Sequence, residues 1–99
     1  MIIVELKVVP VGTNSASVSG YVAKAVGALK KLGLKPEITA MGTIFETETM
    51  EKALEGIKKA HQAVFSEGAD RVVTFAEIDE RKDKEGSMKQ KVESAKKKL

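Results

Sequence analysis

The chain has 99 residues, of which 42% are hydrophobic and 31% are charged, and its formal net charge is +3. This length is typical of one small domain with a modest core, and the composition is that of a folded rather than a disordered protein. The absence of cysteine excludes a disulfide scaffold, a cysteine nucleophile, a thiolate zinc site and a cysteine-ligated iron–sulfur cluster.

The distribution of charged and apolar residues along the chain bears on the cellular location of the protein and on its partners. The apolar runs are too short to span a membrane, and Glu5 and Lys7 interrupt the first of them, so we expect a soluble cytoplasmic protein without a signal peptide. Residues 1–78 hold nine basic and nine acidic residues, and the whole positive excess lies in residues 79–99. A neutral body argues against a nucleic-acid partner, because such proteins concentrate positive charge on their working face. The scarcity of Asn and Gln beside many Lys and Glu hints at a thermophilic source.

The first half of the chain predicts a strand, a helix and the start of a hairpin. Residues 2–10 are rich in β-branched side chains, and Pro10 is expected to end this strand. Either Ser15 or Ser17 is expected to cap the following helix. Apolar residues then recur at helical spacing from 18 to 32, and Gly33 is the expected stop. Residues 37–40 and 43–48 form two strands joined by a turn at Met41-Gly42.

The second half predicts a helix, a strand and a final helix. Thr49 is expected to cap a helix over residues 50–64, which ends before Gly68. Residues 71–79 form the fourth strand. Ser87 and Gln90 form a capping box at the start of the last helix, whose narrow apolar stripe is Met88, Val92, Ala95 and Leu99.

This order of elements predicts the fold. Strand, helix, strand, strand, helix and strand make the α+β ferredoxin-like β-α-β-β-α-β sandwich, with a four-stranded antiparallel sheet and an additional C-terminal helix. Residues 1–99 are expected to form a single domain. The sheet face away from the helices would carry an apolar patch of Ile3, Val9, Val73 and Phe75, which predicts self-association into a homo-oligomer. The alternative is that the last helix folds back and covers this face.

Few residues are available for catalysis. The single histidine, His61, lies on an apolar helix stripe, where a structural hydrogen bond is expected, and no nucleophile is tied to it by spacing. We therefore predict no enzyme activity, no catalytic residues, no metal site and no cofactor, and the scattered glycines match no phosphate-binding motif. RNA recognition is disfavoured because the expected first strand carries no aromatic residue.

Small-molecule binding fits the sequence better. The first loop and the hairpin carry many uncharged hydroxyls and a few carboxylates, which suit a polar and even cationic heterocycle. The same residues have ordinary structural uses as helix caps and strand formers, so composition leaves this interpretation open. The residues concerned are Thr13, Ser15, Ser17, Ser19, Thr39, Thr43, Glu46, Thr47 and Glu48.

Longer segments resemble one known family. The segments are VVPVGTNSASVSGYVAKAVGALKKLGLK, MGTIFETE, GADRVVTFAEIDERKD and MKQKVES, and together they cover essentially the whole chain in order. They resemble the small thiamine-binding protein family, whose members were long known as conserved hypothetical proteins and are related to the thiamine- and hydroxymethylpyrimidine-binding protein YkoF. The resemblance implies a ferredoxin-like fold, dimers and tetramers formed through the sheets, and binding of thiamine or its pyrimidine part without catalysis.

The resemblance also implies a set of site residues. By position these are Ser17 and Ser19 at the start of the first helix, and Thr39, Thr43 and Glu46 on the hairpin. In this set Thr43 would bond the aminopyrimidine edge, Glu46 would offset the thiazolium charge, and Phe45 would belong to the core. Arg71 and Asp79 match the family as well, and for both we expect a salt bridge or an oligomer contact. The chain departs from the family at Thr47, where glycine is usual and where a side chain could narrow the pocket.

The function predicted from the sequence is therefore a non-enzymatic cytoplasmic binding protein for thiamine or a related pyrimidine, working as a homo-oligomer. Its partners would be the small-molecule ligand and further copies of itself, as a dimer or tetramer, without nucleic acid or membrane. Two alternatives remain: an ACT-like regulatory module that senses an amino acid, and a structural oligomer without a ligand.

Overall fold

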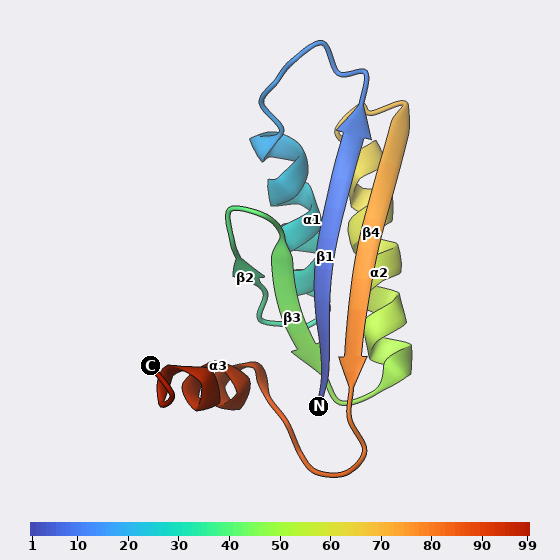
Figure 1. The fold of residues 1–99 in the computed structure, drawn as a ribbon. Coiled ribbons are helices and arrows are strands. Elements are labelled where there is room, and N and C mark those ends of the chain that lie inside the picture. Colours follow the sequence, from blue (N-terminus) through green and yellow to red (C-terminus); the bar gives the residue numbers. More distant parts are fainter.

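One four-stranded antiparallel sheet organises the protein, in a computed structural model that describes residues 1–99 (Figure 1). The strands lie in the order β2-β3-β1-β4, so β1 is central and pairs with β3 and with β4. The predicted ferredoxin-like α+β order is confirmed. The element bounds are β1 Ile2–Val11, α1 Ser19–Lys31, β2 Glu37–Ile38, β3 Thr43–Thr47, α2 Met50–Phe65, β4 Arg71–Glu80 and α3 Met88–Lys96.

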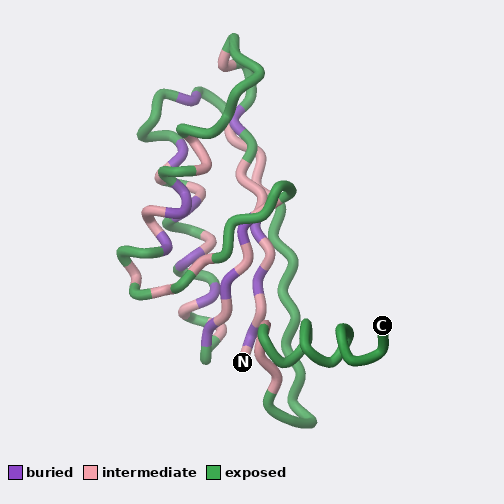
Figure 2. Tube along the Cα trace, turned by 90° about the vertical axis from the view of Figure 1, so that its left-hand side faces the viewer, coloured by how far each residue is buried: buried purple, intermediate pink, exposed green.

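The core lies between the sheet and the helices α1 and α2, which cover the same face (Figure 2). Alternate residues of β1 point into it because side chains of a strand alternate between faces. Ile2, Val4 and Leu6 are buried, and Phe45 of β3 and Leu29 of α1 are fully buried beside them. Phe45 is therefore a core residue, as expected. The opposite face, which we call the open face, is bare except near α3.

Two helix caps are confirmed and one is wrong. The hydroxyl of Thr49 accepts from the Lys52 amide at 3.2 Å, and that of Ser87 accepts from the Gln90 amide at 3.1 Å. In contrast, the residue that precedes α1 is Val18, and no side chain caps this helix. The Ser15 hydroxyl instead accepts from the Ser17 amide, which closes a turn in the loop before the helix.

The expectation that Pro10 ends the first strand is also wrong. β1 continues to Val11, and Pro10 pairs with Val72 of β4. β3 covers β1 only as far as Leu6, so from there onward one edge of β1 has no neighbour. A proline is tolerated at such an edge because no partner strand needs its missing N–H.

At Gly56 the backbone of α2 lies close against the core. A Cβ placed on it would lie 3.1 Å from the Phe45 ring and 3.2 Å from Leu29. Exchange of a helical glycine for alanine ordinarily adds about 0.5–1 kcal/mol of stability. Here we expect Gly56→Ala to lower the free energy of unfolding, because overpacking a core costs about 1–3 kcal/mol.

Gly27 of α1 supplies the matched control. A Cβ there would meet no atom within 4 Å, so Gly27→Ala should raise the free energy of unfolding by about 0.5–1 kcal/mol. Urea unfolding of both variants, followed by circular dichroism, measures the difference. Equal stabilisation by the two alanines would contradict a close contact between Gly56 and the Phe45 ring.

Candidate functional site

A pocket of about 180 Å³ lies between the start of α1, β1 and the turn that joins β2 to β3. We call it the hairpin pocket. Most of its lining is apolar, and the only charged residue in it is a lysine. The lining residues are Leu6, Lys7, Val8, Val18, Val22, Ala25, Leu29, Thr39, Ala40, Met41, Gly42 and Thr43. Gly42 lets the turn approach β1, since a Cβ on it would lie 3.2 Å from the Leu6 carbonyl oxygen.

Thr43 supplies the one buried polar side chain of the hairpin pocket. It is 6% exposed and points toward the helices from the first position of β3. The Thr43 hydroxyl makes no hydrogen bond within the protein. Every fully enclosed side-chain oxygen of the structure has a hydrogen-bond partner, so this hydroxyl is not fully enclosed. The Thr43 hydroxyl is therefore not sealed in the core but opens onto the pocket. It is free to bond a ligand without first breaking an internal hydrogen bond.

The other hydroxyls implied by the family resemblance have different surroundings. Thr39 lines the pocket, but its hydroxyl is committed to the turn: it donates to the Gly42 carbonyl at 2.8 Å and accepts from two amides of the turn. Ser17 and Ser19 are exposed on either side of Val18, with their hydroxyl oxygens 3.5 Å apart. Thr39 thus shapes the pocket, and the two serines lie next to its rim.

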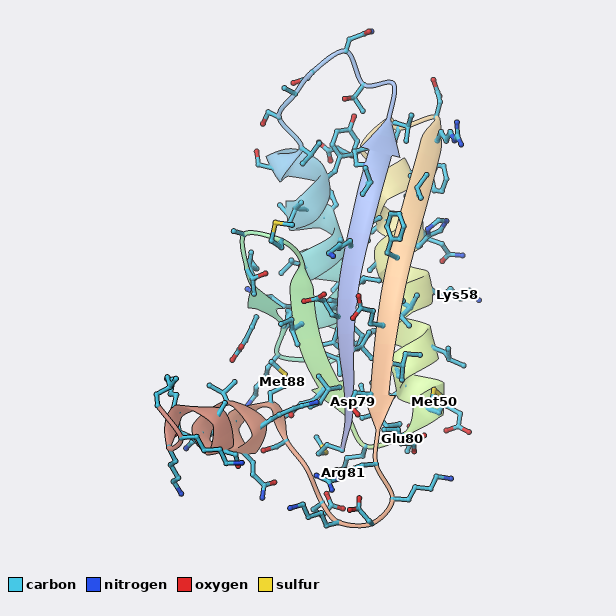
Figure 3. All side chains as sticks on the ribbon, in the orientation of Figure 1. Met50, Lys58, Asp79, Glu80, Arg81 and Met88 are labelled. Carbon is cyan, nitrogen blue, oxygen red and sulfur yellow. The ribbon has the colours of Figure 1, made fainter.

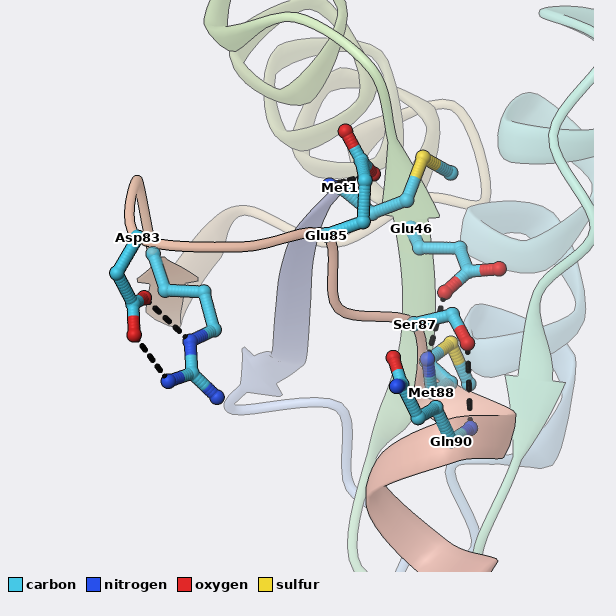
Figure 4. A network of polar contacts seen from close by, with 8 residues as sticks. Met1, Glu46, Asp83, Glu85, Ser87, Met88 and Gln90 are labelled. Carbon is cyan, nitrogen blue, oxygen red and sulfur yellow. Dashed lines mark hydrogen bonds and ion pairs between the residues drawn. The ribbon is translucent and has the colours of Figure 1, made fainter.

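Glu46 lies on the other side of the sheet from Thr43. The two residues are three positions apart in one strand, so their side chains point to opposite faces. Glu46 accepts a hydrogen bond from the Met88 amide at 2.7 Å and so holds the first turn of α3 on the open face (Figure 4). The structure brings Thr39 and Thr43 together in the hairpin pocket and leaves Glu46 outside it.

Thr47, the departure from the family pattern, does not line the hairpin pocket. It is 3% exposed, and its hydroxyl donates to the Thr49 carbonyl at 2.9 Å at the far end of β3. Its side chain therefore does not narrow the approach to Thr43.

α3 forms a second hollow on the open face, of about 450 Å³, which we call the α3 groove. Its lining mixes apolar and charged side chains: Ile3, Glu37, Ile44, Met88, Lys89, Lys91, Val92 and Glu93. α3 itself buries no residue and projects away from the sheet, with Met88 beside the end of β3 (Figure 3). The helix therefore covers only one end of the open face, and Val9 and Phe75 stay exposed.

Charged pairs hold the segment between β4 and α3. A hydrogen bond from Arg81 lowers the pKa of Asp83 to about 2, and the same bond raises the pKa of Arg81. A hydrogen bond and the charge of Lys91 lower the pKa of Asp79 from 3.8. Because these carboxyl pKa values are depressed, the contribution of the pairs to stability is fully present above about pH 4 and is lost as the pH falls through the lowered values. The salt bridge expected for Asp79 is therefore present, and it lies apart from the hairpin pocket.

His61 has the structural role expected for it. Its Nδ1 lies 2.5 Å from the Thr74 hydroxyl, and its ring packs edge-on against Phe65 at 5.4 Å. No group of three or more His, Asp or Glu side chains is placed to hold a metal ion. None of the three helices combines the length and the apolar character needed to cross a membrane.

Sequence reasoning missed most of the apolar lining of the hairpin pocket. Val18 and Val22 follow the same helical spacing as true core residues, so nothing in the pattern separates a pocket wall from a packed face. Met41 is 75% exposed at the rim and was assigned only to the turn. The close approach of Gly42 to β1 depends on tertiary structure.

Comparison with known proteins identifies the family. A family described as thiamine-binding protein matches residues 4–96, from β1 to the end of α3. The chain belongs to the thiamine-binding protein family. The chain is 50% identical to the UPF0045 protein of Methanothermobacter thermautotrophicus over 99 residues. This match covers 100% of both chains.

Solved structures of relatives share the fold of this thiamine-binding family member. The MJ1052 protein of Methanocaldococcus jannaschii is 41% identical, with a TM-score of 0.87 over 96% of this chain and 95% of that one. The DUF77 domain of Bacillus cereus is 30% identical, with a TM-score of 0.79 over 92% of this chain and 86% of that one.

Proposed function

We propose that the protein binds thiamine or its pyrimidine part, hydroxymethylpyrimidine, in the cytoplasm and without catalysing a reaction. Its membership of the thiamine-binding protein family supports a binding role. The observation that carries the proposal is the Thr43 hydroxyl, which is free of internal partners in a largely apolar pocket. Ligand sites of proteins are mostly apolar hollows with a few polar groups that orient the ligand, and the hairpin pocket has this character.

In the proposed complex an aromatic ring enters the hairpin pocket and its amino edge bonds the Thr43 hydroxyl. Thr39 holds the turn that forms one wall, and Ser17 and Ser19 contact the part of the ligand that remains at the rim. Glu46 takes no part in this site within its own subunit, because it lies across the sheet and holds α3. Any role of Glu46 toward ligand would therefore be on the open face.

A thermal-shift titration tests this function. Purified protein is titrated with thiamine, thiamine phosphates, hydroxymethylpyrimidine and the amino acids. A ligand at ~100 times its dissociation constant adds about 2.7 kcal/mol to stability, which in a domain of this size raises Tm by roughly 10 °C or more. We expect a shift with thiamine or the pyrimidine and none with amino acids. A response to amino acids alone would favour an ACT-like sensor, and no response at all would favour a structural oligomer.

We also propose that the protein assembles into a dimer or tetramer through the open face. Phe75 is 58% exposed there and lies opposite Lys7, while Val9 pairs with Val73 in the same part of the sheet. Such an apolar patch on a bare sheet is typical of an association surface. α3 does not cover it.

Phe75→Glu should shift the protein to a smaller species, because a carboxylate in the apolar patch would have to lose its water on association. Light scattering coupled to gel filtration measures the molar mass of the wild type and the variant at equal concentration. Leu54→Glu is the matched control, since Leu54 is 53% exposed on α2 and away from the open face. A monomeric wild type, or equal masses for both variants and the wild type, would contradict assembly through Phe75.

A further inference from the structure

The hairpin pocket offers a ligand one uncommitted hydroxyl among mostly apolar walls. Thr43 is only 6% exposed, and its hydroxyl opens onto the pocket without a hydrogen-bond partner in the protein. The other hydroxyl in the lining, that of Thr39, is occupied by the turn. A group that enters the pocket must therefore be mostly apolar and carry a hydrogen-bonding edge that one hydroxyl can satisfy.

The size of the hairpin pocket limits the ligand to one ring. Its volume is about 180 Å³, below the ~300–1,000 Å³ of pockets that enclose drug-sized ligands. A single substituted six-membered ring is of the right scale, whereas a second ring must remain at the rim, beside Val18 and Met41.

The charges around the hairpin pocket disfavour a cation at that rim. No carboxylate lines the pocket, and its only charged lining residue is Lys7. The ammonium of Lys7 lies 3.9 Å from the Glu5 carboxylate, so this pair adds no free negative charge. The start of α1 contributes the positive end of a helix dipole, which no side-chain cap or acidic residue of the first turn offsets.

Two carboxylates come near this region, and both are engaged elsewhere. Glu67 approaches Gly20 of α1, but its other oxygen pairs with Lys24 at 3.8 Å and it does not line the pocket. Glu46 lies across the sheet and accepts from the Met88 amide. A permanent cation at the rim would thus lie near Lys7 and the positive end of α1 without a counter-charge, which is unfavourable.

From the size, the single free hydroxyl and the missing counter-charge, we infer that the hairpin pocket selects an uncharged heteroaromatic ring over a permanent cation. Applied to the proposed function, on which this inference depends, the free aminopyrimidine binds more tightly than thiamine, whose thiazolium ring carries a fixed positive charge. The preferred ligand is then the neutral pyrimidine fragment, and thiamine is the weaker one.

Three ligands distinguish the effect of the ligand's charge on affinity from the effect of its size. They are 4-amino-5-hydroxymethyl-2-methylpyrimidine, thiamine, and an analogue of thiamine in which an uncharged thiophene replaces the thiazolium. Isothermal titration calorimetry on the full chain should give the pyrimidine and the thiophene analogue an affinity at least about tenfold above that of thiamine, a difference of about 1.4 kcal/mol. Thiamine binding as tightly as its thiophene analogue would overturn the inference and leave the proposed function intact. Binding of none of the three would overturn both.

A substitution at the rim tests the missing counter-charge directly. Met41 is 75% exposed, so Met41→Glu places a carboxylate at the mouth without disturbing the core. It should raise the affinity for thiamine by about two- to fivefold, the scale of an exposed ion pair, and leave that for the neutral pyrimidine unchanged. Met41→Gln is the matched uncharged control. Equal effects of Met41→Glu on both ligands, or no effect on thiamine, would show that charge at this rim does not set the specificity.

Discussion

Phe45→Ala should lower the free energy of unfolding by about 3–5 kcal/mol, which is the range for removing a fully buried aromatic side chain. Phe45 is 0% exposed, and its ring lies beside Leu29 against Gly56 of α2. Because the ring is fully buried, its removal leaves a cavity in the core and loses the transfer free energy of the ring. A domain of this size has a total stability of only about 5–15 kcal/mol, so the variant is expected to be close to unfolding.

The matched control for Phe45→Ala is Leu54→Ala, because Leu54 is 53% exposed on α2 and lies away from the open face. Its effect on a folded subunit should stay within about 0.5 kcal/mol, as for most surface positions. Denaturant unfolding followed by circular dichroism compares the two variants at equal protomer concentration, since self-association would add to apparent stability. Equal losses in the two variants would contradict the placement of Phe45 in the core.

Thr43→Val should reduce affinity for the bound pyrimidine roughly tenfold or more, while the fold stays intact. Valine matches threonine in shape but lacks the hydroxyl, so the ligand edge would be buried without a partner, at a cost of about 1–3 kcal/mol. Stability should change little because the Thr43 hydroxyl makes no hydrogen bond within the protein. Isothermal titration calorimetry measures the affinity, and unfolding experiments on the same samples measure the stability.

Two further variants show whether a loss of binding in Thr43→Val comes from the hydroxyl. Thr43→Ser keeps the hydroxyl and removes one methyl group, so it should lose about 0.5–1.5 kcal/mol of stability and retain most of the affinity. Glu46→Gln should also retain binding, since Glu46 contacts the Met88 amide on the open face. If Glu46→Gln abolished binding and Thr43→Val did not, the ligand site would lie on the open face beside α3.

The order of the elements and their main boundaries follow from local patterns in the sequence. Thr49 and Ser87 cap their helices because a hydroxyl at that position satisfies a free amide in the first turn. Gly33 ends α1 with a φ of 81°, a left-handed conformation that glycine adopts without strain. Such features depend on a few neighbouring residues and are therefore visible in one sequence.

The errors concern features that depend on distant neighbours. Pro10 stays in β1 because β3 ends early and leaves an unpaired edge, which no local pattern reveals. The serines before α1 bond within their own loop and leave the helix uncapped. The docking of α3 depends on a hydrogen bond between Glu46 and Met88, which are 42 residues apart in the chain.

The candidate site was only partly predictable, and strand geometry explains the difference. By position in the family Thr43 and Glu46 belong to one site, although three positions along a strand place two side chains on opposite faces. The alternation alone would have separated them. The walls of the hairpin pocket, in contrast, come from α1, β1 and a turn, and their meeting requires the folded structure.

The most direct test of a ligand site in the hairpin pocket is to map the contact by nuclear magnetic resonance. Backbone amide spectra of ¹⁵N-labelled protein are recorded during titration with hydroxymethylpyrimidine. The largest shifts are predicted at the amides of Val18, Met41 and Thr43, which surround the pocket. Shifts confined to Ile3, Ile44 and Val92 would place the ligand in the α3 groove instead, and would contradict a site built around Thr43.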